Sequence, residues 1–137
     1  MRTDAPTALL YALEETLVRE ANPEKAAGMK AYMKNRFDFM GVQKPARTAI
    51  QKIYFPQLRQ MGFSGESMLH HCWQKNEREW QYLGMDYALS QPKNLPQKLA
   101  DWEYWITHKS WWDTVDLLAT RGVGFRLQND PETRSEV

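Results

Sequence analysis

Trp112 and Asp116 are the two side chains whose spacing most directly indicates chemistry, because they stand four residues apart in KSWWDTVD (109–116). On a helix capped by Ser110, residues four apart share one face, so an indole ring and a carboxylate would lie side by side. The ring face attracts positive charge and the carboxylate pairs with it, which predicts a binding site for a cation. The competing interpretation places Trp112 in the core and pairs Asp116 with a basic residue of a neighbouring helix. Spacing alone leaves both interpretations open.

The neighbours of this pair have simpler expected roles. Asp113 falls in the first turn of the predicted helix, where the helix dipole favours a carboxylate. Trp111 is expected to point towards the core together with Val115 and Leu118.

Basic residues are concentrated in residues 30–59, although the net charge of the chain is only +1. In this segment one acid, Asp38, is accompanied by seven basic residues: Lys30, Lys34, Arg36, Lys44, Arg47, Lys52 and Arg59. A segregated basic stretch indicates a polyanionic partner. A solvated helix face explains the same pattern without any partner.

Other residue types that bind metals or act as nucleophiles are expected to be structural. Adjacent His70 and His71 project to different helix faces, and we recognise no cysteine or carboxylate at ligand spacing, so no metal is expected. Cys72 is expected in the core. Glu77 and Glu79 stand at a predicted helix start, which favours a capping and dipole role for both.

The composition is that of a single soluble domain of 137 residues, 1–137, long enough to bury a core without disulfides or a metal. With one cysteine there is no disulfide framework within the chain, which favours a reducing compartment. The N-terminus lacks the pattern of a signal peptide, and no apolar run is long enough to cross a bilayer. We therefore expect a cytoplasmic protein with no membrane partner.

The periodicity of apolar residues is helical nearly throughout and predicts an all-α fold. Helices are expected at about 6–20, from an Asn22 cap to about 35, from about 45, from Ser64, at 77–90, at 95–109 and from Ser110. Pro56 is expected to kink or end the third of these. Four tryptophans alternate with aliphatic residues at helical spacing and are expected mainly to pack between repeats: Trp73, Trp80, Trp102 and Trp105.

Short helices in antiparallel pairs, 64–75 with 77–90 and 95–109 with 111–122, favour a HEAT-like α-solenoid rather than a closed bundle. Residues 129–137 resemble the start of a further helix, or are disordered. We therefore expect the chain to be the N-terminal portion of a longer domain, with an apolar C-terminal end that could drive self-association.

Three motifs carry a resemblance to a known family: AYMKNRFDFMGVQKPAR (31–47), WQKNEREWQYLGMDY (73–87) and ITHKSWWDTVD (106–116). In this order and at these separations, they resemble the AlkD-like DNA alkylation-repair glycosylases, a HEAT-like-repeat family. The resemblance covers much of the chain from about residue 22 to residue 116.

The resemblance implies a monofunctional glycosylase that binds duplex DNA on a concave basic surface and releases cationic N3- and N7-alkylated purines, with no metal or organic cofactor. Motif for motif, Asp116 corresponds to the family's catalytic carboxylate, and Trp112 and Tyr32 to aromatic residues beside the lesion. Candidates for phosphate contacts are Lys30, Lys34, Arg36, Lys44, Arg47 and Lys109.

One departure from the family concerns a further arginine and a further lesion-side tryptophan, which lie on later helices. Arg121 and Arg126 come too early to replace that arginine, so we expect weak DNA binding and weak or no activity from these 137 residues. The alternatives are a non-catalytic DNA-binding solenoid and a helical-repeat scaffold for another protein.

Overall fold

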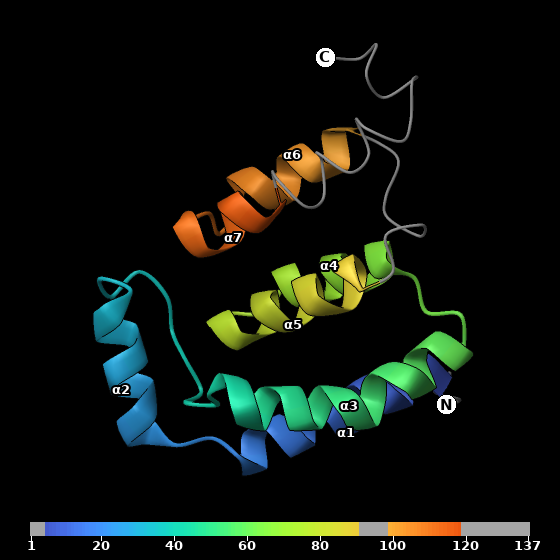
Figure 1. Cartoon of the computed structure of the whole chain (residues 1–137), viewed down its shortest axis with the longest axis horizontal. Coiled ribbons are helices and arrows are strands. Elements are labelled where there is room, and N and C mark those ends of the chain that lie inside the picture. The colour runs from blue at the N-terminus through green and yellow to red at the C-terminus, as the bar shows by residue number, and fades with distance from the viewer. Residues whose placement is uncertain (1–4, 91–98, 119–137) are drawn as a thin grey trace. The chain divides into compact units, whose positions relative to one another are not determined.

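Every regular element in the described parts of the chain is a helix (Figure 1). The computed structural model describes residues 5–90 and 99–118, and the helices run in the order α1 (Ala5–Arg19), α2 (Pro23–Tyr32), α3 (Lys44–Gln60), α4 (Gly65–Trp73), α5 (Arg78–Leu89), α6 (Leu99–Thr107) and α7 (Trp112–Leu117). Outside the helices, an isolated bridge pairs Asp38 with Glu77. The prediction of an all-α fold is confirmed.

The chain forms two compact units, which are described separately. The first unit comprises Met1–Phe63 and Lys75–Leu83, and the second comprises Ser64–Gln74 and Gly84–Val137. Helix α5 therefore contributes its first half to the first unit and its second half to the second unit.

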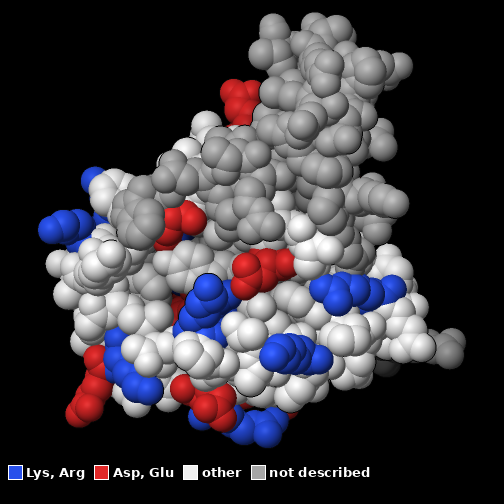
Figure 2. Space-filling view, in the orientation of Figure 1, with Lys and Arg blue, Asp and Glu red and all other residues white. Residues whose placement is uncertain are grey.

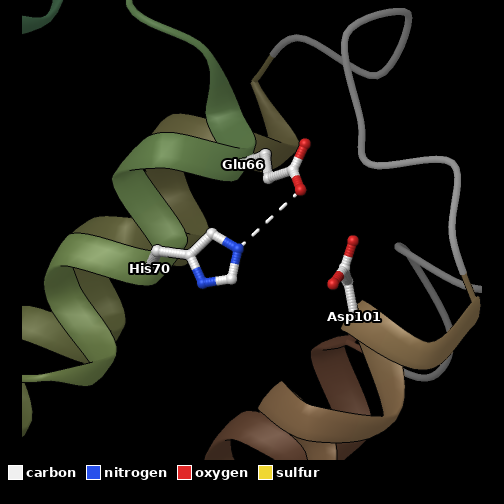
Figure 3. Close-up of side chains that lie close together, drawn as sticks. All are labelled: Glu66, His70 and Asp101. Atoms are coloured by element: carbon white, nitrogen blue, oxygen red, sulfur yellow. Dashed lines mark ion pairs between the residues drawn. The ribbon is translucent and has the colours of Figure 1, made fainter.

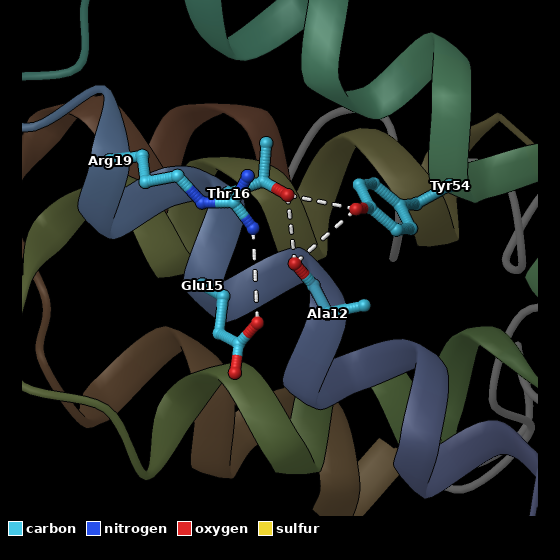
Figure 4. Close-up of polar contacts among 5 residues, drawn as sticks. All are labelled: Ala12, Glu15, Thr16, Arg19 and Tyr54. Atoms are coloured by element: carbon cyan, nitrogen blue, oxygen red, sulfur yellow. Dashed lines mark hydrogen bonds and ion pairs between the residues drawn. The ribbon is translucent and has the colours of Figure 1, made fainter.

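In the first unit, α1 packs alongside α3 and runs in the opposite direction (Figure 1). Leu13 and Leu17 of α1 and Leu58 of α3 are fully buried. The hydroxyl groups of Thr16 and Tyr54 lie 2.8 Å apart, and the Tyr54 hydroxyl also donates to the Ala12 carbonyl at 3.3 Å (Figure 4). This polar contact fixes the register of the two helices beside their apolar interface.

On the outer surface of α1, Glu15 and Arg19 form an ion pair at 3.8 Å (Figure 4). Both side chains are more than 70% exposed, at 74% and 73%. An exposed pair of this kind contributes little to stability because water and salt screen it.

In the second unit, α4 and the second half of α5 pack closely and antiparallel. A Cβ at Gly65 would lie 3.1 Å from the Ala88 backbone, and one at Gly84 would lie 2.9 Å from Cβ of Cys72. These glycines let the two helices approach to contact distance. Across the two units, the four tryptophans predicted to pack between repeats are each at most 1% exposed, which confirms that they are core residues: Trp73, Trp80, Trp102 and Trp105.

The predicted helix starts at Asn22 and Ser64 are confirmed. Oδ1 of Asn22 accepts from the Lys25 N–H at 3.1 Å, and Oγ of Ser64 accepts from the Ser67 N–H at 3.0 Å. Each bond satisfies one of the free N–H groups of the first turn.

One predicted helix end is wrong, and of the two effects predicted for Pro56, a kink or a helix end, the helix end is excluded. Helix α2 ends at Tyr32 rather than near residue 35, because Lys34 and Asn35 both have a φ of 59°, which a right-handed helix excludes. Helix α3 continues through Pro56 to Gln60. Pro56 has no N–H to donate to the Lys52 carbonyl one helical turn earlier. Both residues are exposed, so water can reach that carbonyl in place of the missing donor.

Among the described residues, no helix is both long enough and apolar enough to cross a membrane. The predicted helix starts at 94–96 and 129–137 lie outside the described residues, as do Arg121 and Arg126.

Candidate functional site

Helix α7 carries the candidate cation-binding pair, and its start differs from the prediction. Its N-cap residue is Trp111, with φ −161° and ψ 169°, and the Trp111 carbonyl accepts the first helical bonds from the Thr114 and Val115 N–H groups. The expected cap, Ser110, instead donates its hydroxyl to the Thr107 carbonyl at 3.3 Å. Ser110 therefore satisfies the end of α6 and not the start of α7.

The turn between α6 and α7 is held from α4. The buried indole of Trp73 donates through Nε1 to the carbonyls of Trp105, at 3.2 Å, and His108, at 2.9 Å. These carbonyls lie at the C-terminal end of α6, where intrahelical donors run out. Lys109 then reverses the chain with a φ of 56°. A core tryptophan thus positions the turn that leads into α7.

Thr114 and Leu118 form the buried side of α7, since both are 0% exposed. Trp111 and Val115 are half-buried beside them. The prediction that three side chains point towards the core is therefore confirmed fully for Leu118 and in part for Trp111 and Val115. At about 3.6 residues per turn, positions 112 and 116 fall on the side of the helix opposite to positions 114 and 118. The side chains of Trp112 and Asp116 themselves lie outside the described part of the structure.

Tyr32, the third residue of the predicted lesion site, is the last residue of α2 and is 73% exposed. The next residue, Met33, is buried at 3% and caps the helix. Tyr32 belongs to the first unit, whereas Trp112 and Asp116 belong to the second.

The segment between α2 and α3, residues 33–43, is fixed by a buried carboxylate of α5. Glu79 is 0% exposed and accepts from the backbone N–H groups of Met40, at 3.0 and 3.1 Å, Gly41, at 2.9 Å, and Val42, at 3.0 Å. Its predicted place in the first turn of α5, where the helix dipole favours a carboxylate, is confirmed, but its carboxylate accepts hydrogen bonds from a distant loop rather than capping its own helix. Sequence position at a helix start gave no signal of this partner.

Three further contacts hold the same segment. The backbone N–H of Arg78 donates to the Asp38 carbonyl at 2.8 Å, and the buried Arg78 guanidinium lies 3.8 Å from the centre of the Phe37 ring. The Asn22 N–H donates to the Met40 carbonyl at 2.9 Å. The loop that carries the basic residues at 34 and 36 is thus anchored directly after them.

The six candidate phosphate-binding residues differ in accessibility. Lys34, Arg36 and Lys44 are exposed, and Lys109 is half-buried. Lys30 donates to Oδ1 of Asp38 at 3.0 Å. On the face seen in Figure 2, lysine and arginine side chains are interspersed with acidic ones and do not form one uninterrupted basic patch.

Arg47 does not fit its predicted role as a phosphate contact. It is 7% exposed, its Nη1 donates to Oε1 of Gln51 at 3.0 Å, and its guanidinium lies 5.3 Å from the centre of the Tyr82 ring. A side chain enclosed in this way is a core residue of the first unit, so we remove it from the candidate phosphate contacts.

A cluster of metal-ligating side chains was missed by the sequence reasoning. Glu66, His70 and Asp101 place one ligand atom each within 4.8 Å of the others (Figure 3). The premise that no carboxylate stands at ligand spacing is wrong, because Glu66 precedes His70 by one helical turn. That spacing was readable from the sequence, whereas the approach of Asp101 from α6 was not. Cys72 is buried, as predicted.

Antiparallel helix pairs and a short helix bearing WWDTVD define an all-helical protein with a candidate site for a cationic ligand. The model of the DNA alkylation repair enzyme family matches residues 13–137, and the chain belongs to this family. This confirms the resemblance carried by the three motifs.

The structure is also similar to that of a predicted DNA alkylation repair enzyme from Enterococcus faecalis, with 31% sequence identity and a TM-score of 0.64. The match covers 82% of this chain and 54% of the other, so the chain spans about half the length of that protein. Among curated proteins, none matches the chain significantly.

Proposed function

We propose that the chain provides the catalytic carboxylate of a DNA glycosylase that excises cationic N3- and N7-alkylated purines from duplex DNA. One observation carries the proposal: a member of the DNA alkylation repair family has Trp112 and Asp116 one turn apart on α7, opposite to the buried positions of that helix. That arrangement supports an outward-facing indole and carboxylate.

The chemistry of alkylated purines suits this pair. Alkylation at N3 or N7 gives the base a positive charge and makes it a good leaving group, so no strong general acid is needed. As the N-glycosidic bond breaks, positive charge develops on the sugar, as in the oxocarbenium-like transition state of glycoside hydrolysis. Asp116 would stabilise that charge and orient the water that attacks the anomeric carbon.

The aromatic residues would hold the substrate. Trp112 and Tyr32 are proposed to contact the cationic nucleotide through their ring faces. The high exposure of Tyr32, at 73%, supports a role in which its ring meets a partner rather than the core.

Phosphate contacts are proposed for the accessible basic residues: Lys30, Lys34, Arg36, Lys44 and Lys109. Neutralised phosphates supply much of the affinity of any duplex-binding protein and make it depend steeply on salt. Exposure supports Lys34, Arg36 and Lys44 most directly. Lys30 would have to exchange its ion pair with Asp38 for a phosphate.

The test is base release from a duplex containing N7-methylguanine, comparing the chain with Asp116→Asn. Base release by the 137-residue chain is expected to be weak, and in Asp116→Asn it should fall by roughly a further hundredfold, which is typical of removing one preorganised electrostatic group, while duplex binding is kept. Asp113→Asn is the matched control, because Asp113 lies on the same helix one turn from Asp116. Release that is unchanged in Asp116→Asn would refute the assignment.

The non-catalytic alternative has its own signature in the same experiment. A chain that binds duplex in a salt-dependent manner, yet releases no base from the methylated duplex, would be a DNA-binding member of the family without this activity.

A further inference from the structure

We propose that Glu66, His70 and Asp101 form a binding site for a divalent first-row transition-metal ion of the Zn²⁺ type, which links α4 to α6. All three residues belong to the second unit. Glu66 lies in the first turn of α4, His70 lies one turn later on the same helix, and Asp101 lies in the first turn of α6.

The three side chains converge on one point between the two helices (Figure 3). Nε2 of His70 is 3.7 Å from Oε1 of Glu66, and the three ligand atoms all lie within 4.8 Å of one another. Two ligands of a tetrahedral Zn²⁺, each at about 2.0–2.2 Å from the ion, are about 3.3–3.6 Å apart. Glu66 and His70 are thus already close to that separation, and a shift of about 1 Å, within the range of side-chain rotation, brings Asp101 to the same distance.

The imidazole is held by packing. The ring of His70 meets the ring of Trp105 edge to face, with centres 5.1 Å apart and an interplanar angle of 62°. Trp105 is itself 0% exposed and packs edge to face on Trp102 at 5.6 Å. A ring braced on the core in this way loses little further freedom when Nε2 binds an ion.

The spacing between the two helices is fixed as well. Trp73 of α4 donates its indole N–H to the carbonyls of Trp105 and His108, at the C-terminal end of the α6 segment. This buried bond lies one turn after His70 along α4. The ligands from α4 and α6 therefore face each other on a preformed frame, which is the condition for a site that binds without refolding.

Helix dipoles explain only in part why Glu66 and Asp101 lie beside His70. A carboxylate in a first turn is stabilised by the dipole, and this applies to Glu66 and to Asp101 separately. It does not explain why both carboxylates converge on the same imidazole ring. With neutral His70, two like charges within 4.8 Å repel each other, and a divalent cation would neutralise both.

The donor set selects the kind of ion. One imidazole nitrogen with two carboxylate oxygens suits Zn²⁺, Mn²⁺, Co²⁺ or Ni²⁺, and three protein ligands leave a position for water. Mg²⁺ prefers oxygen ligands only and keeps most of its water. An ion bound here would hold α4 and α6 together and stabilise the folded chain, because the unfolded chain does not bring these residues together.

The test is calorimetric titration of the 137-residue chain with Zn²⁺, together with thermal unfolding with and without the ion. We expect one ion per chain, a higher unfolding temperature with Zn²⁺ that a chelator reverses, and no comparable rise with Mg²⁺. Asp101→Asn and His70→Gln should each weaken binding by at least about tenfold, as loss of a ligand or its support does.

Matched controls separate the site from unspecific binding. Glu103→Gln and His108→Gln change an exposed acid and an exposed histidine on or next to α6 and should leave Zn²⁺ affinity within about twofold of the parent chain. Asp101→Asn is isosteric, and circular dichroism without metal will show that it folds. Zn²⁺ affinity that is equal in the parent and Asp101→Asn chains, or no rise in unfolding temperature with Zn²⁺, would overturn the proposal.

Discussion

Replacing Glu79 by glutamine should destabilise the chain far more than its place at a helix start implies. The Glu79 carboxylate is fully buried and accepts three backbone N–H groups, those of Met40, Gly41 and Val42, at 2.9–3.1 Å. Hydrogen bonds to a charged acceptor contribute about 1.5–3 kcal/mol, against about 0.5–1.5 kcal/mol for neutral ones. Weakening three such bonds by about 1 kcal/mol each predicts a loss of about 3 kcal/mol in the free energy of unfolding.

The assay is urea unfolding at neutral pH, followed by circular dichroism, with the free energy of unfolding extrapolated to water. The control is Glu77→Gln, which removes the neighbouring half-buried carboxylate of the same helix start and should change stability by less than about 0.5 kcal/mol. Against a typical total of about 5–15 kcal/mol, the expected difference between the two variants is large.

A loss below about 1 kcal/mol in Glu79→Gln, with an unchanged dependence on urea, would refute the reasoning. It would mean that the amide replaces the carboxylate as acceptor without cost, or that the loop 33–43 is held chiefly by its other contacts. Equal losses in the two variants would instead indicate a general helix-dipole effect.

Two backbone predictions follow from the same structure. Gly41→Ala should lower the free energy of unfolding in urea by at least about 2 kcal/mol, because Gly41 has a φ of 90° and a Cβ there would overlap the Asn22 carbonyl. The control is Gly62→Ala, which should lower it by only about 1 kcal/mol, because Gly62 has a φ of 75° but open space around a Cβ. Equal losses in the two variants would exclude the overlap as a cause. Pro56→Ala should raise the free energy of unfolding by about 1–2 kcal/mol in thermal unfolding, since alanine restores an N–H donor within α3, and a lower stability would show that the proline is required there.

The helices could be predicted because their signals are local. The Asn22 and Ser64 side chains each cap an N–H group three residues away. The helical periodicity of apolar residues shows which face of a helix is buried. Pro56 left a kink and a helix end as alternatives in the sequence, because the cost of a proline depends on whether water can reach the carbonyl it leaves unpaired. That is a property of the folded surface.

The candidate site was predictable only where it lies within one helix. The spacing of Trp112 and Asp116 is fixed by the period of α7, and the three motifs were sufficient to indicate the family. The role of Arg47 was not predictable, because a basic residue is expected at the surface unless tertiary neighbours such as Gln51 and Tyr82 enclose it.

The sequence by itself determined the helices, the tryptophan core and the family, because each depends on residues a few positions apart or on the order of motifs. Tertiary structure alone decided that Glu79 binds a loop nearly forty residues earlier and that Asp101 meets His70 from another helix. The physical reason is that a side chain's partner is set by which backbones approach it, and a helix start or a charge pattern does not encode that approach.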